Sequence, residues 1–170
     1  MKIMKIGLTG SVASGKTTAS KIIAKRRGPL FSADKVVNKL YSQNKFKRLI
    51  SKRINFKLDK DFKKKLRGKI LQKKGNLKKL ERIIHPLVRK EMFIFFKKNK
   101  KKNFLFLEIP LLIESKLARY FDIIIFIKSN KKLRLKRYML RGGSQSLFYL
   151  LDKHQIKDSR KMKFCDHIVV

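Results

Sequence analysis

Residues 10–17 combine glycine, lysine and threonine at a spacing suited to binding phosphate, because they read Gly-Ser-Val-Ala-Ser-Gly-Lys-Thr and fit G-x-x-x-x-G-K-S/T. Glycines at 10 and 15 let backbone N–H groups turn inward on an anion without a Cβ in the way. Lys16 adds a fixed cation, and the hydroxyl of Thr17 is suited to hold Mg²⁺. This segment, called the P-loop below, predicts a site for the phosphates of a nucleoside triphosphate.

Two further candidates are acids that follow predicted strands. Asp34 lies just beyond a predicted strand at residues 29–32, where a carboxylate could accept the proton of an acceptor hydroxyl; it could equally cap the following helix. Glu108 ends an apolar strand at residues 104–107, where a carboxylate would orient the water ligands of Mg²⁺. The alternative for Glu108 is a buried carboxylate that holds the turn at Pro110.

Three arginines form the last candidate group. Arg134, Arg137 and Arg141 are spaced by three and four residues on one predicted helix, which runs into a glycine pair at residues 142–143. A guanidinium at this place could close over the phosphates and neutralise the charge that develops on the transferred phosphoryl group. Arg141, beside the glycine hinge, is the first choice and Arg137 the second, and a solvated helix face is the alternative.

The elements that must position these residues alternate along the chain. The P-loop lies between a predicted strand at residues 3–8 and a helix from residue 18, whose N-terminal dipole would face the anion. Further strands are expected at residues 29–32, 104–107, 122–127 and 167–170. Helices are expected at residues 34–41, 46–53, 61–98, 131–141 and 147–157. The long helical stretch 61–98 is expected to be interrupted at residues 75–76 and 85–86. The succession predicts a doubly wound parallel α/β sheet with the nucleotide at the carboxyl ends of its strands.

Length and composition narrow the class of protein. The 170 residues make one domain with an adequate core, and the one cysteine, Cys165, leaves no disulfide framework and favours a reduced, cytoplasmic setting. No stretch of about eighteen apolar residues is present, so no membrane span is expected.

The net charge of +36 raises the alternative of a nucleic-acid-binding protein. Lysine greatly outnumbers arginine and is spread along the whole chain, which favours a compositional bias on solvated faces over a dedicated nucleic-acid surface. No specific nucleic acid is therefore expected. The charge would still attract polyanions and cause nonspecific binding at low salt.

Several motifs occur in the order seen in dephospho-coenzyme A kinases, and from about residue 3 to residue 170 the chain resembles this family. The motifs are the P-loop with its flanks at residues 7–18, Ser-Ala-Asp at 32–34, Leu-Glu-Arg-Ile-Ile-His-Pro-Leu-Val at 80–88, Glu-Ile-Pro-Leu-Leu-Ile-Glu at 108–114, and residues 133–141. A His-Pro step combined with a Pro-Leu-Leu-x-Glu step is much more specific than the P-loop alone.

The resemblance implies transfer of the ATP γ-phosphoryl group, with Mg²⁺, to the ribose 3′-hydroxyl of dephospho-coenzyme A. It implies that Asp34 activates this hydroxyl, that Lys16 acts in catalysis and that Arg141 is the lid arginine. The residues expected to bind ATP are Gly10, Ser11, Ala13, Ser14, Gly15, Lys16, Thr17, Thr18 and Arg137, with Thr17 and Glu108 at the metal. The residues expected at the acceptor are Asp34, Lys63, His85, Glu108, Pro110, Leu111 and Glu114.

The resemblance also implies the architecture: a five-stranded sheet of the nucleotide-kinase type with an inserted helical lobe and a lid. We expect one domain over residues 1–170, with a core at about 1–33 and 103–170, a substrate lobe at about 34–102 and a lid at about 137–150. The family usually has an acid where this chain has Ser32, and often an arginine where it has Lys63. It also typically continues beyond the last residue here through an Asn-containing turn that borders adenine and then a terminal helix. Without that segment, we expect either weaker ATP binding or an exposed sheet edge.

Two other functions fit the residues less well. One is a P-loop kinase for another small molecule or nucleotide, which an acceptor panel would distinguish. The other is a basic nucleic-acid-binding protein that keeps the P-loop for regulation, which would bind a preferred sequence at physiological salt.

Overall fold

The computed structural model describes residues 3–73 and 75–170, which divide into two compact units. The first, called the core unit, consists of Met1–Ala33 and Ile94–Val170. The second, called the helical unit, consists of Asp34–Phe93. The two units are described separately below.

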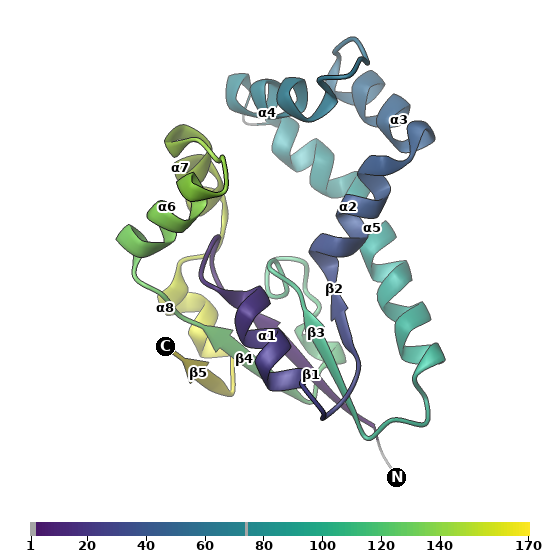
Figure 1. The fold of residues 1–170 in the computed structure, drawn as a ribbon, viewed down its shortest axis with the longest axis vertical. Helices are drawn as coiled ribbons and strands as arrows, with labels where there is room; N and C mark the ends of the chain where they lie inside the picture. The colour runs from purple at the N-terminus through teal and green to yellow at the C-terminus, as the bar shows by residue number, and fades with distance from the viewer. Residues whose placement is uncertain (1–2, 74) are drawn as a thin grey trace. The chain divides into compact units, whose positions relative to one another are not determined.

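The core unit is built on a parallel sheet of strand order β2-β3-β1-β4-β5 (Figure 1). The strands are β1 (Met4–Thr9), β2 (Leu30–Ser32), β3 (Phe104–Glu108), β4 (Ile123–Ile127) and β5 (His167–Val169). Every strand pair in this sheet is parallel. The predicted doubly wound parallel fold of five strands is confirmed, and each strand lies within a residue or two of its predicted place.

The strands in the middle of the sheet are rich in apolar residues, which suits their buried position. A parallel sheet covered on both faces needs continuous apolar strands rather than alternating ones, and β3 and β4 read Phe-Leu-Phe-Leu and Ile-Ile-Ile-Phe-Ile. Leu8, Leu105, Leu107 and Phe126 have no exposed surface, so β1, β3 and β4 form the centre of the core. The short strand β5 lies at one edge, and all three of its residues are exposed.

Helices of the core unit lie beside this sheet. Helix α1 (Lys16–Ala24) packs against β1, β2 and β3, where Ala24 joins Ile6, Leu8 and Phe106 in one buried cluster. The unit also contains α6 (Lys131–Leu140), α7 (Gln145–His154) and the short α8 (Asp158–Lys161). Two 3₁₀ turns complete the unit, at Ala118–Tyr120 and Met162–Phe164.

The helical unit is formed by α2 (Ala33–Ser42), α3 (Asn44–Ile54), α4 (Phe62–Gln72) and most of α5 (Gly75–Lys98). Apolar residues at helical spacing bury one face of α3, α4 and α5, the apolar residues of α2 within this unit are half-buried, and aromatic rings join the helices. The ring of Tyr41 lies 5.7 Å from that of Phe46 and 5.9 Å from that of Phe62. The unit thus has a small core of its own.

Helix α5 departs from the sequence prediction. A break was expected at His85-Pro86, because proline lacks an N–H and crowds the preceding turn, but α5 continues through Pro86. Buried residues four apart on both sides of the proline, Leu80, Ile84, Val88 and Met92, keep one face packed. Tertiary burial therefore outweighs the local cost, and the predicted break was wrong.

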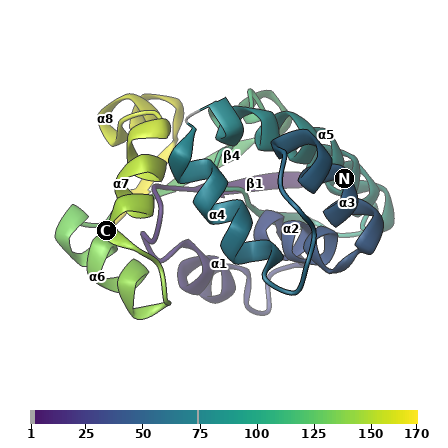
Figure 2. The same cartoon turned by 90° about the horizontal axis from the view of Figure 1, so that it is seen from above.

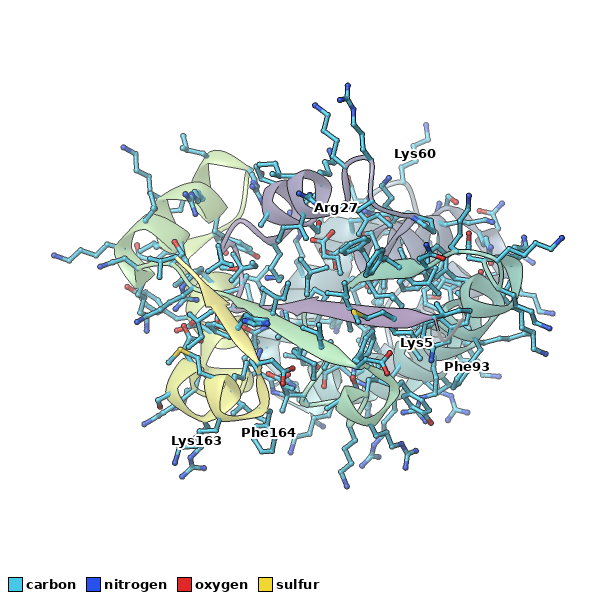
Figure 3. The ribbon with its side chains drawn as sticks, turned by 90° about the horizontal axis from the view of Figure 1, so that it is seen from below. Lys5, Arg27, Lys60, Phe93, Lys163 and Phe164 are labelled. Atoms are coloured by element: carbon cyan, nitrogen blue, oxygen red, sulfur yellow. The ribbon has the colours of Figure 1, made fainter. Side chains whose placement is uncertain are left out.

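The basic side chains lie mostly outside. Figure 3 shows Lys163 extending away from the ribbon of the core unit, and Lys60 extending away from that of the helical unit. Among the helices in the described part of the chain, none has the length and apolar character that crossing a bilayer would need.

Candidate functional site

The P-loop connects β1 to α1 and depends on glycine at two places. A Cβ on Gly10, whose φ is +152°, would lie 2.4 Å from the carbonyl oxygen of Ile127. Gly15 has a φ of +99° and ends the loop in a left-handed conformation directly before α1. Ala13 is left-handed as well, at φ +58°, and Thr18 is exposed in the first turn of the helix. The strand, loop and helix predicted from sequence are all present, so the loop's backbone N–H groups gather at a helix N-terminus.

Two polar side chains of the loop are buried inside it. The Lys16 side chain is 7% exposed, and its Nζ donates a hydrogen bond to the carbonyl oxygen of Ser11 at 2.7 Å. The Ser14 hydroxyl is buried and makes no hydrogen bond within the described residues. A ligand oxygen in the loop would satisfy that hydroxyl, because a buried polar group without a partner is costly.

Glu108 meets α1 at the carboxyl end of β3. Its Oε1 accepts a 2.6 Å hydrogen bond from the Thr17 hydroxyl, and its Oε2 accepts a 3.4 Å bond from the Ser20 hydroxyl. The carboxylate is almost fully buried, and Glu108 pairs in register with Leu8 of β1, just before the P-loop. A hydroxyl and a carboxylate in contact are hard oxygen ligands, the kind that Mg²⁺ takes together with substrate phosphates. Within residues 3–73 and 75–170, the hydrogen bonds of the Glu108 side chain go to α1 and not to the Pro110 turn, so they do not support its alternative role of holding that turn.

Helices α6, α7 and α8 lie beside the P-loop (Figure 2). From α6, the buried Arg134 donates through Nη1 to Val12 O at 3.4 Å and to Asp152 Oδ1 at 2.6 Å. Lys131 also reaches Asp152, at 3.0 Å. Burial raises the pKa of Asp152, but the hydrogen bonds from Arg134 and Lys131 outweigh it, so this pKa lies below its usual range. Arg134 is therefore held between α7 and the loop as a structural cation.

Arg137 lies directly against the loop. Its Nη1 donates to Ser14 O and to the Ser129 hydroxyl, both at 3.2 Å, and a Cβ on Gly15 would lie 3.5 Å from the same nitrogen. Arg141 is exposed where α6 ends. Of the two arginines ranked from sequence, the second choice is thus the one that contacts the P-loop in this structure.

The segment after α7 supplies two contacts that sequence reasoning missed. The Val12 N–H donates to Gln155 Oε1 at 3.0 Å, and the Ser11 hydroxyl donates to Asp158 Oδ1 at the start of α8. These residues lie about 145 positions apart in sequence. Residues 155–157 were assigned to the end of a helix, and no motif marked them.

The loop after β3 carries three residues predicted at the acceptor. The carbonyl oxygen of Pro110 accepts from the Thr9 hydroxyl at 3.1 Å, and Leu111 is half-buried. Glu114 forms an ion pair with Lys161, Nζ to Oε1, at 2.8 Å. This carboxylate therefore has a structural partner in the core unit.

The other predicted residues belong to the helical unit. Asp34 is exposed in the first turn of α2, His85 is half-buried on α5, and Lys63 is exposed on α4. Lys63 lines a cavity of about 660 Å³ within this unit, whose other lining residues are Tyr41, Lys47, Lys60, Asp61, Phe62, Lys64, Arg67, Gly68 and Leu71. Half of the lining residues are basic, and two are aromatic. Burial raises the pKa of Tyr41 to about 12, so its phenol stays neutral.

The structure thus gathers one set of predicted residues in the core unit. The P-loop, Glu108 and Arg137 are connected there by hydrogen bonds. Asp34, Lys63 and His85 stand in the helical unit. A phosphate cradle with a lysine, a carboxylate-bound hydroxyl and an arginine is the equipment of phosphoryl transfer.

Comparisons with known proteins agree with this chemistry. The family model described as dephospho-CoA kinase matches residues 4–170. A dephospho-CoA kinase of Zymomonas mobilis is 33% identical, over 96% of this chain and 85% of the relative. The solved structure of a dephospho-CoA kinase from Campylobacter jejuni superposes with a TM-score of 0.62 at 28% identity, over 97% of this chain and 86% of the other.

A second solved structure, that of TT1252 from Thermus thermophilus, supports the fold. It superposes with a TM-score of 0.76 at 24% identity, over 99% of this chain and 88% of the other. The family resemblance read from the motifs is confirmed by these comparisons.

Proposed function

Because this chain belongs to the dephospho-CoA kinase family, we propose that it transfers the γ-phosphoryl group of ATP to the ribose 3′-hydroxyl of dephospho-CoA, with the residue roles given below. The observation that carries the catalytic part is the contact between the Thr17 hydroxyl and the buried Glu108 carboxylate beside the P-loop. Phosphoryl transfer requires mainly positioning and charge neutralisation, and this end of the sheet supplies both.

The P-loop holds the ATP phosphates. Its backbone N–H groups and the α1 dipole face the anion, and the Lys16 ammonium moves from the Ser11 carbonyl to a phosphate oxygen. This exchange replaces a neutral acceptor by an anionic one, so it strengthens the hydrogen bond. Arg137 neutralises negative charge on the phosphates, since its guanidinium already lies against Ser14 and Gly15 of the loop. Arg141, exposed directly after the last residue of α6, is the second arginine that we assign to the phosphates.

Thr17 and Glu108 are the residues that would hold Mg²⁺. The fit rests on the chemistry of the pair: a buried carboxylate whose partners are only hydroxyls in the described residues is a favourable place for a hard cation. When bound, Mg²⁺ supplies positive charge to the phosphate oxygens. The residues themselves orient the site, because Glu108 holds the Thr17 hydroxyl in one direction.

Asp34 accepts the proton from the 3′-hydroxyl. It is the second residue of α2 and directly follows Ala33, the last residue of this stretch of the core unit. A carboxylate at that point can orient the attacking oxygen and take its proton as the new P–O bond forms. Lys63 and His85 of the helical unit are further residues of the acceptor side.

The cationic cavity of the helical unit is suited to the charged part of the acceptor. Lys47, Lys60, Lys64 and Arg67 line it together with Lys63, against one acid. A molecule with a pyrophosphate would be attracted to such a surface. We also place the enzyme in the cytoplasm, because a single cysteine leaves no disulfide framework and ATP is made available there.

An acceptor panel tests this function. The chain is incubated with MgATP and, separately, dephospho-CoA, adenosine, AMP or shikimate, and kcat/KM is compared from initial rates of ADP release. We expect dephospho-CoA to be preferred by at least about a hundredfold. Lys16→Ala should abolish turnover, while Lys21→Ala, an exposed lysine of the same helix, should behave like wild type. Preference for a nucleoside or for shikimate would refute the assignment.

A further inference from the structure

Lys161 is an unusual residue in this very basic chain because it is completely buried. Among the described residues the buried basic side chains are Lys16, Arg134 and Lys161. The first two contact the P-loop directly. Burying an ammonium group is costly unless it is paired and hydrogen-bonded, so a third buried cation needs an explanation of its own.

The partners of Lys161 come from the loop after β3. Its Nζ lies 2.8 Å from Glu114 Oε1 and 3.4 Å from the carbonyl oxygen of Pro110. The same carbonyl accepts from the hydroxyl of Thr9, the residue immediately before the P-loop. Lys161 therefore attaches α8 to a loop that is itself attached to the end of β1.

Residues 155–161, called the clamp segment, join this anchor to the P-loop. Asp158 and Lys161 are the first and last residues of α8. Asp158 accepts from the Ser11 hydroxyl, and Gln155 accepts from the Val12 N–H. The clamp segment is fixed at a second point, because the Ile156 N–H donates to the same Glu114 oxygen at 3.1 Å. Gln155 and Asp158 thus contact the P-loop, while Ile156 and Lys161 are held by Glu114.

We propose that Lys161 is a positioning residue for the nucleotide, which holds the clamp segment against Ser11 and Val12 of the P-loop. A loop already fixed in its binding conformation loses less conformational entropy when ATP arrives, so the affinity for ATP rises without any contact between Lys161 and the ligand. The proposal goes beyond the residue roles above, and only its choice of ATP as ligand rests on the proposed function.

Nucleotide binding tests this role directly. The full chain and its Lys161→Met variant are titrated by calorimetry with the non-hydrolysable ATP analogue AMP-PNP and Mg²⁺. We expect the Kd of the variant to be about tenfold higher, the effect of losing one or two hydrogen bonds to the P-loop. Lys163→Met is the matched control, since Lys163 is exposed two residues away and points outward (Figure 3), and it should bind like wild type.

Kinetics separate positioning from general damage. In Lys161→Met the KM for ATP should rise about tenfold, while kcat at saturating ATP and the KM for the acceptor stay within about twofold of wild type. The proposal would be overturned if kcat fell and the KM for the acceptor rose together with the KM for ATP, or if the affinity for nucleotide were unchanged. If wild type binds AMP-PNP but phosphorylates no dephospho-CoA, the proposed function fails while the binding test of Lys161 remains decisive.

Two further variants keep the test valid if Lys161→Met does not fold. The double variant Lys161→Met/Glu114→Gln removes both charges of the pair and avoids a buried carboxylate without its cation. The double variant Gln155→Ala/Asp158→Ala leaves the anchor intact and removes its contacts to the P-loop. Each should weaken AMP-PNP binding about tenfold.

The two ends of the clamp segment should also be coupled. Adding Lys161→Met to Gln155→Ala/Asp158→Ala should weaken binding by less than about twofold more, because both changes act through the same contacts. Fully additive losses, or wild-type affinity in Gln155→Ala/Asp158→Ala, would contradict the mechanism.

Discussion

Replacing Glu108 by glutamine separates a metal-orienting carboxylate from a structural one. The side chain is 1% exposed and accepts from the hydroxyls of Thr17 at 2.6 Å and Ser20 at 3.4 Å. Glutamine has nearly the same shape, and its amide can still serve one hydroxyl as acceptor and the other as donor. We therefore expect the free energy of unfolding to change by no more than about 1 kcal/mol, or about 3 °C in Tm.

The effect on phosphoryl transfer should be much larger. The glutamine keeps a hydrogen bond to Thr17 but removes the negative charge that a cation held by this hydroxyl would face, a loss of about 2–3 kcal/mol in stabilisation of the metal. If Glu108 orients the hydroxyl that holds Mg²⁺, this energy corresponds to an activity loss of about 30- to 150-fold at fixed Mg²⁺. Part of the loss should be recovered at high Mg²⁺, because the metal then binds despite the weaker site.

The assay is the initial rate of ADP release over a magnesium titration, with Tm measured on the same preparation. Glu91→Gln is the matched control, since Glu91 is an exposed acid on α5, and it should leave the magnesium dependence unchanged. A Glu108→Gln protein with wild-type magnesium dependence and a Tm lowered by more than about 5 °C would refute the reasoning, because a structural carboxylate predicts that result.

Three further outcomes are expected. Gly10→Ala would bring a Cβ to 2.4 Å from Ile127 O and should lower the free energy of unfolding in urea by about 2–4 kcal/mol. Gly68→Ala, where a Cβ on α4 would meet no other atom within 4 Å, should raise it by about 0.5–1 kcal/mol. Equal effects of the two variants would contradict the packing argument. Asp34→Asn should lower kcat by about 10²–10⁴ and leave the KM for ATP unchanged, and near-normal turnover would remove Asp34 from catalysis. The pKa of Asp152 is lowered in the folded chain, so its carboxylate stabilises the fold above its unfolded-state pKa, and this stability is lost as the pH falls through the folded-state pKa. In urea unfolding, Asp152→Asn should therefore be less stable than wild type at pH 7 and equally stable in strong acid. A difference in stability that stays constant with pH would contradict this argument.

Local sequence was sufficient for the P-loop and the sheet. The loop is formed by contiguous residues whose glycines are required by backbone geometry, as the close approach of Gly10 to Ile127 shows. Glu108 could be singled out because a parallel strand delivers the residue after its apolar run to the same edge as the P-loop.

Contacts between distant segments could not be read in this way. Gln155, Asp158 and Lys161 carry no local pattern, and their roles follow from partners on distant segments, up to 147 positions away. The three- and four-residue spacing of the α6 arginines specifies one helix face. It does not specify which turn of that face meets the loop, and the packing of α6 on α7 brings Arg134 and Arg137 to it.

The most direct test of the central claim is the mass of the product formed from dephospho-CoA and MgATP by the purified 170-residue chain. Our account predicts a species heavier by one phosphoryl group that co-migrates with coenzyme A, and none with Lys16→Ala. A chain that binds AMP-PNP through the P-loop yet leaves dephospho-CoA unmodified would contradict it.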